Sequence, residues 1–386
     1  MKRTAILICA LLLIQTIKSQ TFNQFYADVV ATTSEANVLN DLIEFENFGI
    51  KTVGSTALQN TEGWITNRYE DLGYTDVVLQ PFTYSAGTSN NIIVTKTGTI
   101  YPNTFLIIDA HYDTINGPGT NDNGTGTVLL LELARLLKNV ETEYSIKFIH
   151  FSGEEDGLIG SNYYVNNTVI PQNLDIKLVF NIDEVGGVNG ITNDTVVCER
   201  DLTNPSSNNA ASNEATNSLA ILIELYSNLN TEISNAFASD YVPFENNGEI
   251  ITGLYESNVS PVNHTANDNL ANMDVTYAYE VIKGSLGAAM EFAVAYETLS
   301  TEEQTYFDDL ITISPNPSHN FININFNQPL EDPVNFKLID LLGQNVYEDA
   351  LTQTSQTINV DNISSSKYFA VFTIASKRIV KTVIID

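Results

Sequence analysis

Polar residues with metal-binding or catalytic side chains follow three apolar segments of this sequence, where buried strands are expected to end. Because the carboxyl ends of parallel strands meet at one edge of a sheet, we expect these side chains to lie close together. The residues are His111 and Asp113 after residues 104–110, Glu154 and Glu155 after residues 145–151, and Asp183 after residues 177–182.

Two further residues of the same kinds lie in polar loops. Asp122 is part of Asn121-Asp122-Asn123-Gly124, and His264 begins His264-Thr265-Ala266-Asn267-Asp268. Each of these residues, taken alone, is more typical of a turn, a helix cap or a surface loop. Together, two imidazoles and several carboxylates suit zinc, and carboxylate-rich sites also accept manganese or cobalt.

Glu154 and Glu155 are adjacent, and the stretch that contains them reads FSGEEDGLIGS. Neighbouring side chains of an extended segment point in opposite directions, so the two carboxylates can have different roles. One could bind a metal while the other moves a proton. By itself the pair is more typical of a charged turn, and only the other candidate residues favour the catalytic interpretation.

The elements that would position these residues alternate between strands and helices. The runs 104–110, 145–151 and 177–182 are almost continuously apolar, as expected for strands buried on both faces. Helix-like apolar spacing is found in residues 37–48, 61–73, 128–137, 215–229 and 275–297. This order predicts an α/β fold with a mostly parallel central sheet and helices on both faces.

The pattern changes near residue 300. Residues 301–310 are polar and acidic, which is typical of a linker, and short alternating runs separated by turn residues follow from residue 311 to residue 386. These runs predict a small all-β sandwich. We therefore predict a catalytic domain over residues 20–300, a linker over 301–310 and a β-sandwich over 311–386.

Residues 1–19 are predicted to be a secretory signal peptide, with Lys2 and Arg3 preceding an apolar core at residues 5–17. That core is too short to span a membrane, and no other apolar stretch is long enough. Cleavage would leave Cys198 as the single cysteine, which is more typical of a core residue than of a catalytic thiol. The net charge of -30 argues against nucleic-acid binding.

Five motifs appear here in the order in which the zinc aminopeptidases of the peptidase M28 family carry them. They are H-x-D, (D/N)-D-N-G-x-G, G-E-E-x-G-L-x-G-S, N-x-D and H-T-x-x-D, and the chain resembles that family over about residues 37–297. The resemblance implies two zinc ions per subunit. It implies that His111 and Asp183 bind one ion, that Glu155 and His264 bind the second, that Asp122 bridges both, and that Glu154 is the general base.

The same resemblance implies roles for two more carboxylates and for the backbone. Asp113 would orient His111, Asp268 would orient His264, and the peptide bond after Asp122 would be cis. The implied activity is that of a secreted exopeptidase, an aminopeptidase that removes N-terminal residues from peptides with a free N-terminus. Glu154 would take a proton from a metal-bridging water and return it to the leaving amine.

Two positions depart from the family pattern. Asn263 stands where a tyrosine often precedes the last metal-binding histidine and stabilises the oxyanion. Tyr241, in Ser239-Asp240-Tyr241, stands where the family usually has a histidine. We therefore consider Asn263 and Tyr241 as candidate oxyanion or substrate contacts, and Phe244 as a candidate part of the substrate pocket. His150 and His319 are interpreted as structural or surface residues.

The C-terminal part resembles the sorting domain of proteins exported by the type IX secretion system. The matching features are Ser314-Pro315-Asn316-Pro317, Asp340-Leu341-Leu342-Gly343-Gln344, Ser366-Lys367-Tyr368-Phe369 and the final residues 381–386. The resemblance implies an interaction with that machinery and a secreted or surface-attached protein. A carbohydrate- or protein-binding module is the alternative for this part.

Three other functions remain open for the larger domain. A carboxypeptidase or a one-zinc glutaminyl cyclase would use the same fold for another reaction. A non-catalytic binding protein on a peptidase scaffold would be expected to lack some of the ligands, and none of the five is missing here. A serine hydrolase is disfavoured because the sequence has no Gly-x-Ser-x-Gly motif.

Overall fold

The computed structural model describes residues 22–298, 306–307, 309–330, 332–341, 343–374 and 377–386. The predicted signal peptide over residues 1–19 lies outside the described residues, as do residues 301–305 and 308 of the predicted linker. Within the described part of the chain, no helix is long and apolar enough to cross a membrane.

The larger domain is built on one sheet of eight strands, in the order β1-β2-β5-β3-β6-β9-β7-β8. The four central strands β5, β3, β6 and β9 are parallel to one another, and β1, β2 and β7 join through antiparallel pairs. The strands are β1 (Val77–Tyr84), β2 (Gly87–Lys96), β3 (Tyr101–His111), β5 (Tyr144–Phe151), β6 (Asp175–Ile182), β7 (Thr195–Arg200), β8 (Asn230–Asn235) and β9 (Ile251–Glu256).

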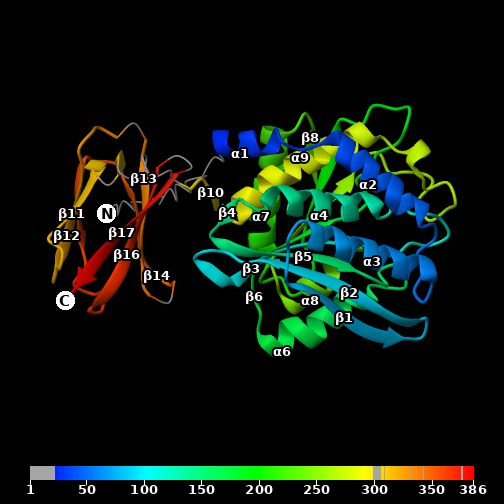
Figure 1. Cartoon of the computed structure of the whole chain (residues 1–386), viewed down its shortest axis with the longest axis horizontal. Helices are drawn as coiled ribbons and strands as arrows, with labels where there is room; N and C mark the ends of the chain where they lie inside the picture. The colour runs from blue at the N-terminus through cyan, green and yellow to red at the C-terminus, as the bar shows by residue number, and fades with distance from the viewer. Residues whose placement is uncertain (1–21, 299–305, 308, 331, 342, 375–376) are drawn as a thin grey trace, which may run out of the picture.

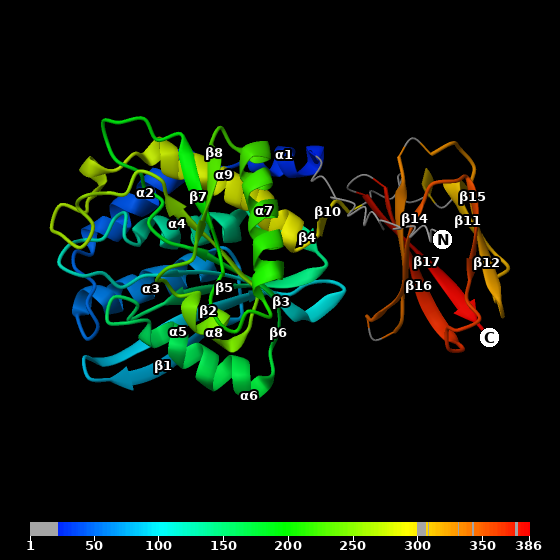
Figure 2. The same ribbon diagram turned by 180° about the vertical axis from the view of Figure 1, so that it is seen from behind.

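Helices cover both faces of this sheet, as Figures 1 and 2 show. Helices α2, α3, α4 and α9 lie over one face, and α5, α6 and α8 lie over the other. The helices are α1 (Gln24–Val30), α2 (Glu35–Asn47), α3 (Thr56–Asp71), α4 (Gly124–Leu137), α5 (Ile159–Tyr164), α6 (Ile170–Gln172), α7 (Asn209–Tyr226), α8 (Val242–Asn247) and α9 (Val275–Phe292). The prediction of an α/β fold with a mostly parallel central sheet and helices on both faces is therefore confirmed.

The two faces of the sheet have separate cores, which explains why the central strands are mostly apolar. In β3, Leu106, Ile108 and Ala110 pack into the larger core with α4 and α9, whereas Ile107 packs into the smaller core with Phe244 of α8. Alternate side chains of a strand point to opposite faces, so a strand covered on both sides carries apolar residues at most positions.

The register of the parallel strands brings the candidate residues to one edge of the sheet. His111, the last residue of β3, pairs with Phe151, the last residue of β5. On its other side β3 pairs Asp109 with Asn181 of β6, so Asp183 follows the end of β6 at the level of His111. The candidate residues that follow β3, β5 and β6 are thus neighbours in space.

The C-terminal part folds as a smaller all-β domain beside the larger one (Figure 1). A three-stranded antiparallel sheet, β11-β12-β15, and a four-stranded one, β14-β13-β16-β17, share one apolar core. The strands are β11 (Ile311–Ser314), β12 (Phe321–Phe326), β13 (Val334–Ile339), β14 (Asn345–Leu351), β15 (Ser355–Asn359), β16 (Ser366–Ile374) and β17 (Lys377–Ile385). The all-β prediction for this region is also confirmed.

The two domains meet at the amino-terminal end of β3. Ile100 of the larger domain packs with Ile339 and Val371 of the smaller one, and the Lys337 Nζ atom lies 3.4 Å from Glu143 Oε2. Because His111 is the last residue of β3, the contact between the domains lies at the opposite end of that strand.

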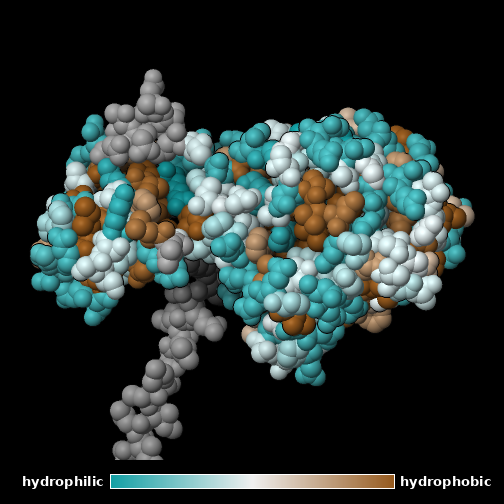
Figure 3. Space-filling view, turned by 60° about the horizontal axis from the view of Figure 1, so that its bottom comes forward, coloured by the Kyte–Doolittle hydropathy of each residue, from teal (hydrophilic) through white to brown (hydrophobic). Residues whose placement is uncertain are grey.

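The face of the molecule in Figure 3 is largely hydrophilic, with hydrophobic residues in separate patches.

The structure differs from the sequence-based predictions in three places: two elements were not predicted, and one helix ends earlier than predicted. Strand β8 was not predicted, because its sequence NTEISN has little apolar alternation and it is an exposed edge strand. Helix α1 was not predicted either. The terminal helix ends at Phe292 instead of residue 297, and Val294 has a positive φ of 52° that takes the chain out of the helix into the short strand β10 (Ala295–Tyr296).

Candidate metal centre

The Asp122 carboxylate lies between the two candidate imidazoles. Its Oδ1 atom is 3.3 Å from His111 Nε2, and its Oδ2 atom is 2.9 Å from His264 Nε2. Asp122 is held in the turn that leads into α4, where the Asn123 side chain caps the helix and the peptide bond between the two residues is cis, as the resemblance implied. One carboxylate therefore faces two separate nitrogen ligands.

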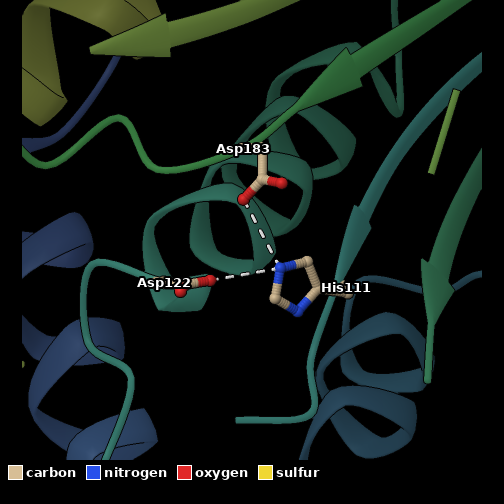
Figure 4. A group of neighbouring side chains, drawn as sticks. All are labelled: His111, Asp122 and Asp183. Atoms are coloured by element: carbon tan, nitrogen blue, oxygen red, sulfur yellow. Dashed lines mark ion pairs between the residues drawn. The ribbon is translucent and has the colours of Figure 1, made fainter. Parts of the chain in front are cut away.

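Each imidazole has a further carboxylate beside it. Asp183 Oδ1 lies 3.4 Å from His111 Nε2, and Figure 4 shows Asp122 and Asp183 pointing toward the same ring nitrogen. Glu155 Oε2 lies 3.1 Å from His264 Nε2. The residues thus form two groups, His111–Asp122–Asp183 and Asp122–Glu155–His264, and within each group the ligand atoms lie within 4.8 Å of one another.

The chemistry of these groups fits metal ions. Asp183 Oδ1 and Glu155 Oε1 are buried and accept no hydrogen bond from the residues that the structure describes. Buried carboxylate oxygens normally have a donor or a cation beside them, because desolvating an unpaired charge is costly. One imidazole with two carboxylates is a ligand set that zinc accepts, and the shared Asp122 would allow two ions side by side.

The electrostatics reflect the concentration of charge at this edge. The pKa of Glu154 is raised to about 10, chiefly by burial and also by the carboxylates of Asp183, Asp240 and Asp113, against the opposing influence of His111. Burial also acts to raise the pKa of Asp122, but hydrogen bonds from His111 and His264 outweigh burial and lower it to about 2. Asp122 is thus held in its charged form in spite of its burial.

Asp113 fixes the turn that carries the two glutamates. Its carboxylate accepts hydrogen bonds from the backbone N–H groups of Glu154, at 3.2 Å, and Glu155, at 3.3 Å. His111 Nδ1 lies 3.1 Å from the backbone carbonyl oxygen of Asp113 and 3.8 Å from the nearer carboxylate oxygen. The His111 ring is therefore oriented chiefly by the Asp113 backbone, and the Asp113 side chain positions Glu154 and Glu155.

Asp268 has a different partner from the one that the resemblance implied. Its two carboxylate oxygens accept hydrogen bonds from the backbone N–H groups of Asn121, at 2.9 Å, and Asp122, at 3.1 Å. Both oxygens are occupied by the loop that carries the shared ligand, so Asp268 positions Asp122 instead of the His264 ring.

Tyr241 and Phe244 are core residues, which corrects their interpretation as possible substrate contacts. The Tyr241 hydroxyl donates a hydrogen bond to Glu199 Oε2 and accepts one from the backbone N–H of Phe237. Phe244 is fully buried and packs against Phe151. The alternation of apolar and polar residues in this segment does not reveal which side chains the fold buries.

His150 and His319 lie where their interpretation as structural or surface residues places them. His150 is fully buried in β5, and its Nε2 atom is hydrogen-bonded to the Tyr69 hydroxyl at 2.9 Å. His319 is exposed in the C-terminal domain.

Sequence reasoning assigned no role to three residues that contact the site. The Ser239 hydroxyl donates a hydrogen bond of 2.7 Å to Asp183 Oδ2, the oxygen that faces away from His111. The Glu256 carboxylate binds the Asn121 side chain and the backbone N–H groups of Gly187 and Ser260. Apart from the contact between Glu256 and Ser260, these contacts join residues far apart in the sequence, so the motif spacing contains no signal for them.

The third unassigned residue is Glu184, which follows Asp183 directly. Its Oε2 atom accepts hydrogen bonds from the Tyr255 hydroxyl, at 3.0 Å, and from Asn263 Nδ2. Burial raises the pKa of Glu184 to about 9, and the carboxylates of Asp122 and Asp183 contribute to the rise. Cations bound by Asp122 and Asp183 would neutralise their charge and so reduce their contribution to the raised pKa of Glu184.

Comparisons with known proteins identify the families of the two domains. A sequence model of peptidase family M28 matches residues 91–287, and a model of the secretion system C-terminal sorting domain matches residues 312–386. Aminopeptidase YwaD of Bacillus subtilis is 43% identical over 101 residues, which are 26% of this chain and 22% of that protein. The chain spans about a fifth to a third of the length of the curated relatives that it matches.

Solved structures share the fold of the larger domain. The LapA aminopeptidase of Legionella pneumophila superposes with a TM-score of 0.64 at 20% identity, covering 77% of this chain and 81% of that one. A glutaminyl cyclase of Macrostomum lignano superposes with a TM-score of 0.61 at 16% identity, covering 70% and 92%. These identities establish similarity of fold alone. The match to the family model spans half of the sequence, and the chain belongs to peptidase family M28.

Proposed function

We propose that this protein is a secreted dizinc aminopeptidase that removes N-terminal residues from peptides. The observation that carries the proposal is the position of Asp122, whose two carboxylate oxygens face His111 and His264. Membership of the M28 family and the aminopeptidases among its relatives support the class of reaction.

In this proposal each group of ligands holds one zinc ion. His111, Asp122 and Asp183 would hold the first, and Asp122, Glu155 and His264 would hold the second. When bound, such a pair of ions lowers the pKa of a water molecule and polarises the scissile carbonyl group.

Glu154 is the proposed general base. Its Oε2 atom lies 4.0 Å from His111 Nε2, so the carboxylate faces the candidate ligands, and its backbone is fixed by Asp113. Glu154 would accept a proton from the attacking water and deliver it to the leaving amine. A base held by a fixed turn loses little entropy on reaching the reactive geometry.

The concentration of carboxylates also favours substrates with a cationic N-terminus. Asp122, Glu154, Glu155 and Asp183 lie together at one edge of the sheet, where an α-ammonium group would be attracted. An enzyme that requires this group acts as an exopeptidase. Blocking the N-terminus of a peptide would remove the charge and the activity.

The completeness of both groups favours this proposal over a one-zinc enzyme. A one-zinc glutaminyl cyclase shares the fold but has no use for a second ligand group. A carboxypeptidase would use the same ions, and the substrate end that is cleaved distinguishes it. A non-catalytic binding protein would have no need of Glu154.

We further propose that residues 1–19 direct export, that residues 20–300 form the catalytic domain, that residues 301–310 link it to the sandwich over residues 311–386, and that the sandwich engages the type IX secretion machinery. The match to the sorting-domain model supports this assignment, and the protein would be secreted or attached to the cell surface.

The direct test is to purify the mature protein, measure its zinc content, and assay aminoacyl anilides beside the same compounds with acetylated N-termini. We expect two zinc ions per chain, hydrolysis of the free compounds only, and loss of activity on chelation that zinc restores. A protein without zinc, or one that cleaves only the acetylated compounds, would refute the proposal.

A further inference from the structure

Glu184 has a carboxylate that is fixed in place at the edge of the candidate metal centre. It follows the ligand Asp183, and its backbone has a positive φ of 48°, a conformation that few residues other than glycine adopt. Tyr255 and Asn263 both donate hydrogen bonds to its Oε2 atom. Residues held in such a conformation are concentrated at functional sites, where surrounding contacts maintain them.

The orientation of the Asn263 amide is determined by a chain of contacts that begins at the backbone. The Gly186 N–H donates to Asn121 Oδ1 at 2.7 Å, so the Asn121 amide nitrogen must be the atom that donates to Glu256. That nitrogen also lies 3.3 Å from Asn263 Oδ1, which leaves Asn263 Nδ2 to donate to Glu184. Backbone N–H groups only donate and carboxylates only accept, so the direction of the chain is unambiguous.

Every side chain in the inner part of this network is adjacent in the sequence to a candidate ligand. Asn121 precedes Asp122, Asn263 precedes His264, and Glu184 follows Asp183. The network therefore ties the Glu184 carboxylate to the segments that carry Asp122, Asp183 and His264. A preorganised charge of this kind binds a partner without first losing side-chain freedom.

The second carboxylate oxygen of Glu184, Oε1, accepts no hydrogen bond from the described part of the protein. Within the described part of the chain, no hydrogen-bond donor reaches Glu184 Oε1, and no Lys, Arg or His forms an ion pair with the side chain. The side chain is partly exposed, so Oε1 is open to a group from outside the protein. A partly buried carboxylate without a cationic partner is a site for a cation.

Resting on the function proposed above, we propose that Glu184 determines specificity by binding the cationic side chain of an N-terminal lysine or arginine. The α-ammonium group is next to the scissile carbonyl and must stay among the ligand carboxylates. Glu184 is one residue beyond them and is tied to Tyr255 of β9. When the scissile peptide bond lies at the candidate ligands, the substrate cation that can reach Glu184 is therefore the charged end of the side chain of the N-terminal residue.

The experiment compares lysyl, arginyl and norleucyl anilides, because norleucine has a chain similar in length to that of lysine without the ammonium group. For the native protein we expect kcat/KM to be about 10- to 100-fold higher for lysine than for norleucine, the range expected for a hydrogen bond to a charged group. The isosteric variant Glu184→Gln should lose this preference and retain its activity on norleucine. Glu224→Gln, on the exposed face of α7, removes the same charge elsewhere and should retain the preference.

Each other result has a definite meaning. Equal losses on lysine and norleucine in Glu184→Gln would overturn the proposal, because they indicate a general role or a contact with the α-ammonium group. Unchanged selectivity in Glu184→Gln would overturn it as well. If the native protein cleaves none of the three anilides yet binds zinc, the proposed aminopeptidase function fails before Glu184 is tested.

Discussion

The carboxylate of Asp268 accepts a hydrogen bond of 3.1 Å from the backbone N–H of Asp122, the residue that faces both imidazoles. A second bond of 2.9 Å, from the backbone of Asn121, occupies its other oxygen. Asp268 thus fixes the loop that carries Asp122, the proposed shared ligand. Replacing a residue that holds a metal ligand in place commonly lowers the affinity for the metal by about 10- to 100-fold.

We predict that Asp268→Asn weakens zinc binding by about 10- to 100-fold, because asparagine supplies one acceptor where the loop has two donors. Competition with a chelator of known affinity measures this change. The variant should recover most of its kcat at saturating zinc. A variant that binds zinc normally but has a low kcat would contradict a role in holding Asp122.

The number of ions bound should depend on which ligand is replaced. Asp122→Ala removes the carboxylate common to both groups, so we expect it to retain no stoichiometric zinc. His264→Ala removes a ligand of one group only, and this variant should retain one ion per chain, held by His111, Asp122 and Asp183. Mass spectrometry of the native-state protein gives the count directly, and equal counts for the two variants would contradict a shared Asp122.

Glu154→Gln should separate metal binding from proton transfer. The amide has nearly the shape of the carboxylate but cannot accept the proton, so we expect kcat to fall by about 100- to 10,000-fold. The zinc content should stay at the native value, because Glu154 belongs to neither ligand group. Near-native activity in this variant would mean that another group is the base.

The sequence predicted the frame of the site better than its supporting contacts. Apolar runs ending in His111, Asp183 and the two glutamates were sufficient to place these residues at one edge, because strand ends in a parallel sheet meet there. The expectations that Asp268 orients His264 and that Tyr241 contacts the oxyanion or the substrate were wrong, since both depend on where a side chain points after loops pack. The spacing of residues in the sequence does not show the direction in which each side chain points in the folded protein.

His150 gives a test of how burial affects stability at low pH. Burial lowers the pKa of His150 to about 3 in the folded protein. In the unfolded chain the pKa of a histidine is about 6.5. Below pH ~6.5 the unfolded chain therefore binds one proton more than the folded chain, and the free energy of unfolding falls as the pH falls toward 3. This contribution is lost at about 1.4 kcal/mol per pH unit.

The variant His150→Gln lacks that titration and keeps a group that can bond to the Tyr69 hydroxyl. Between pH 7.5 and pH 5.0 its free energy of unfolding should change by about 2 kcal/mol less than that of the native protein. Urea unfolding at the two pH values measures the difference. Parallel changes in both proteins would show that His150 is protonated equally in the two states.

The position of the C-terminal domain bears on whether it can affect the proposed activity. The domain contacts Ile100 and Glu143 near the start of β3, and His111 is the last of the 11 residues of that strand. A strand of this length spans roughly 30 Å, so the domain is far from the candidate metal centre. The two domains also have separate apolar cores.

We therefore predict that a protein consisting of residues 20–300 folds and has a kcat/KM within about twofold of that of the longer chain, as expected for domains with independent cores. The control is Lys337→Ala in the longer chain, which breaks the ion pair with Glu143 and should also leave activity unchanged. A folded, zinc-loaded truncated protein with more than about tenfold lower activity would show that the sorting domain supports catalysis through the body of the sheet. Equal activity would mean that the proposed activity does not depend on the sorting domain, so that export and catalysis are separate functions of the two domains.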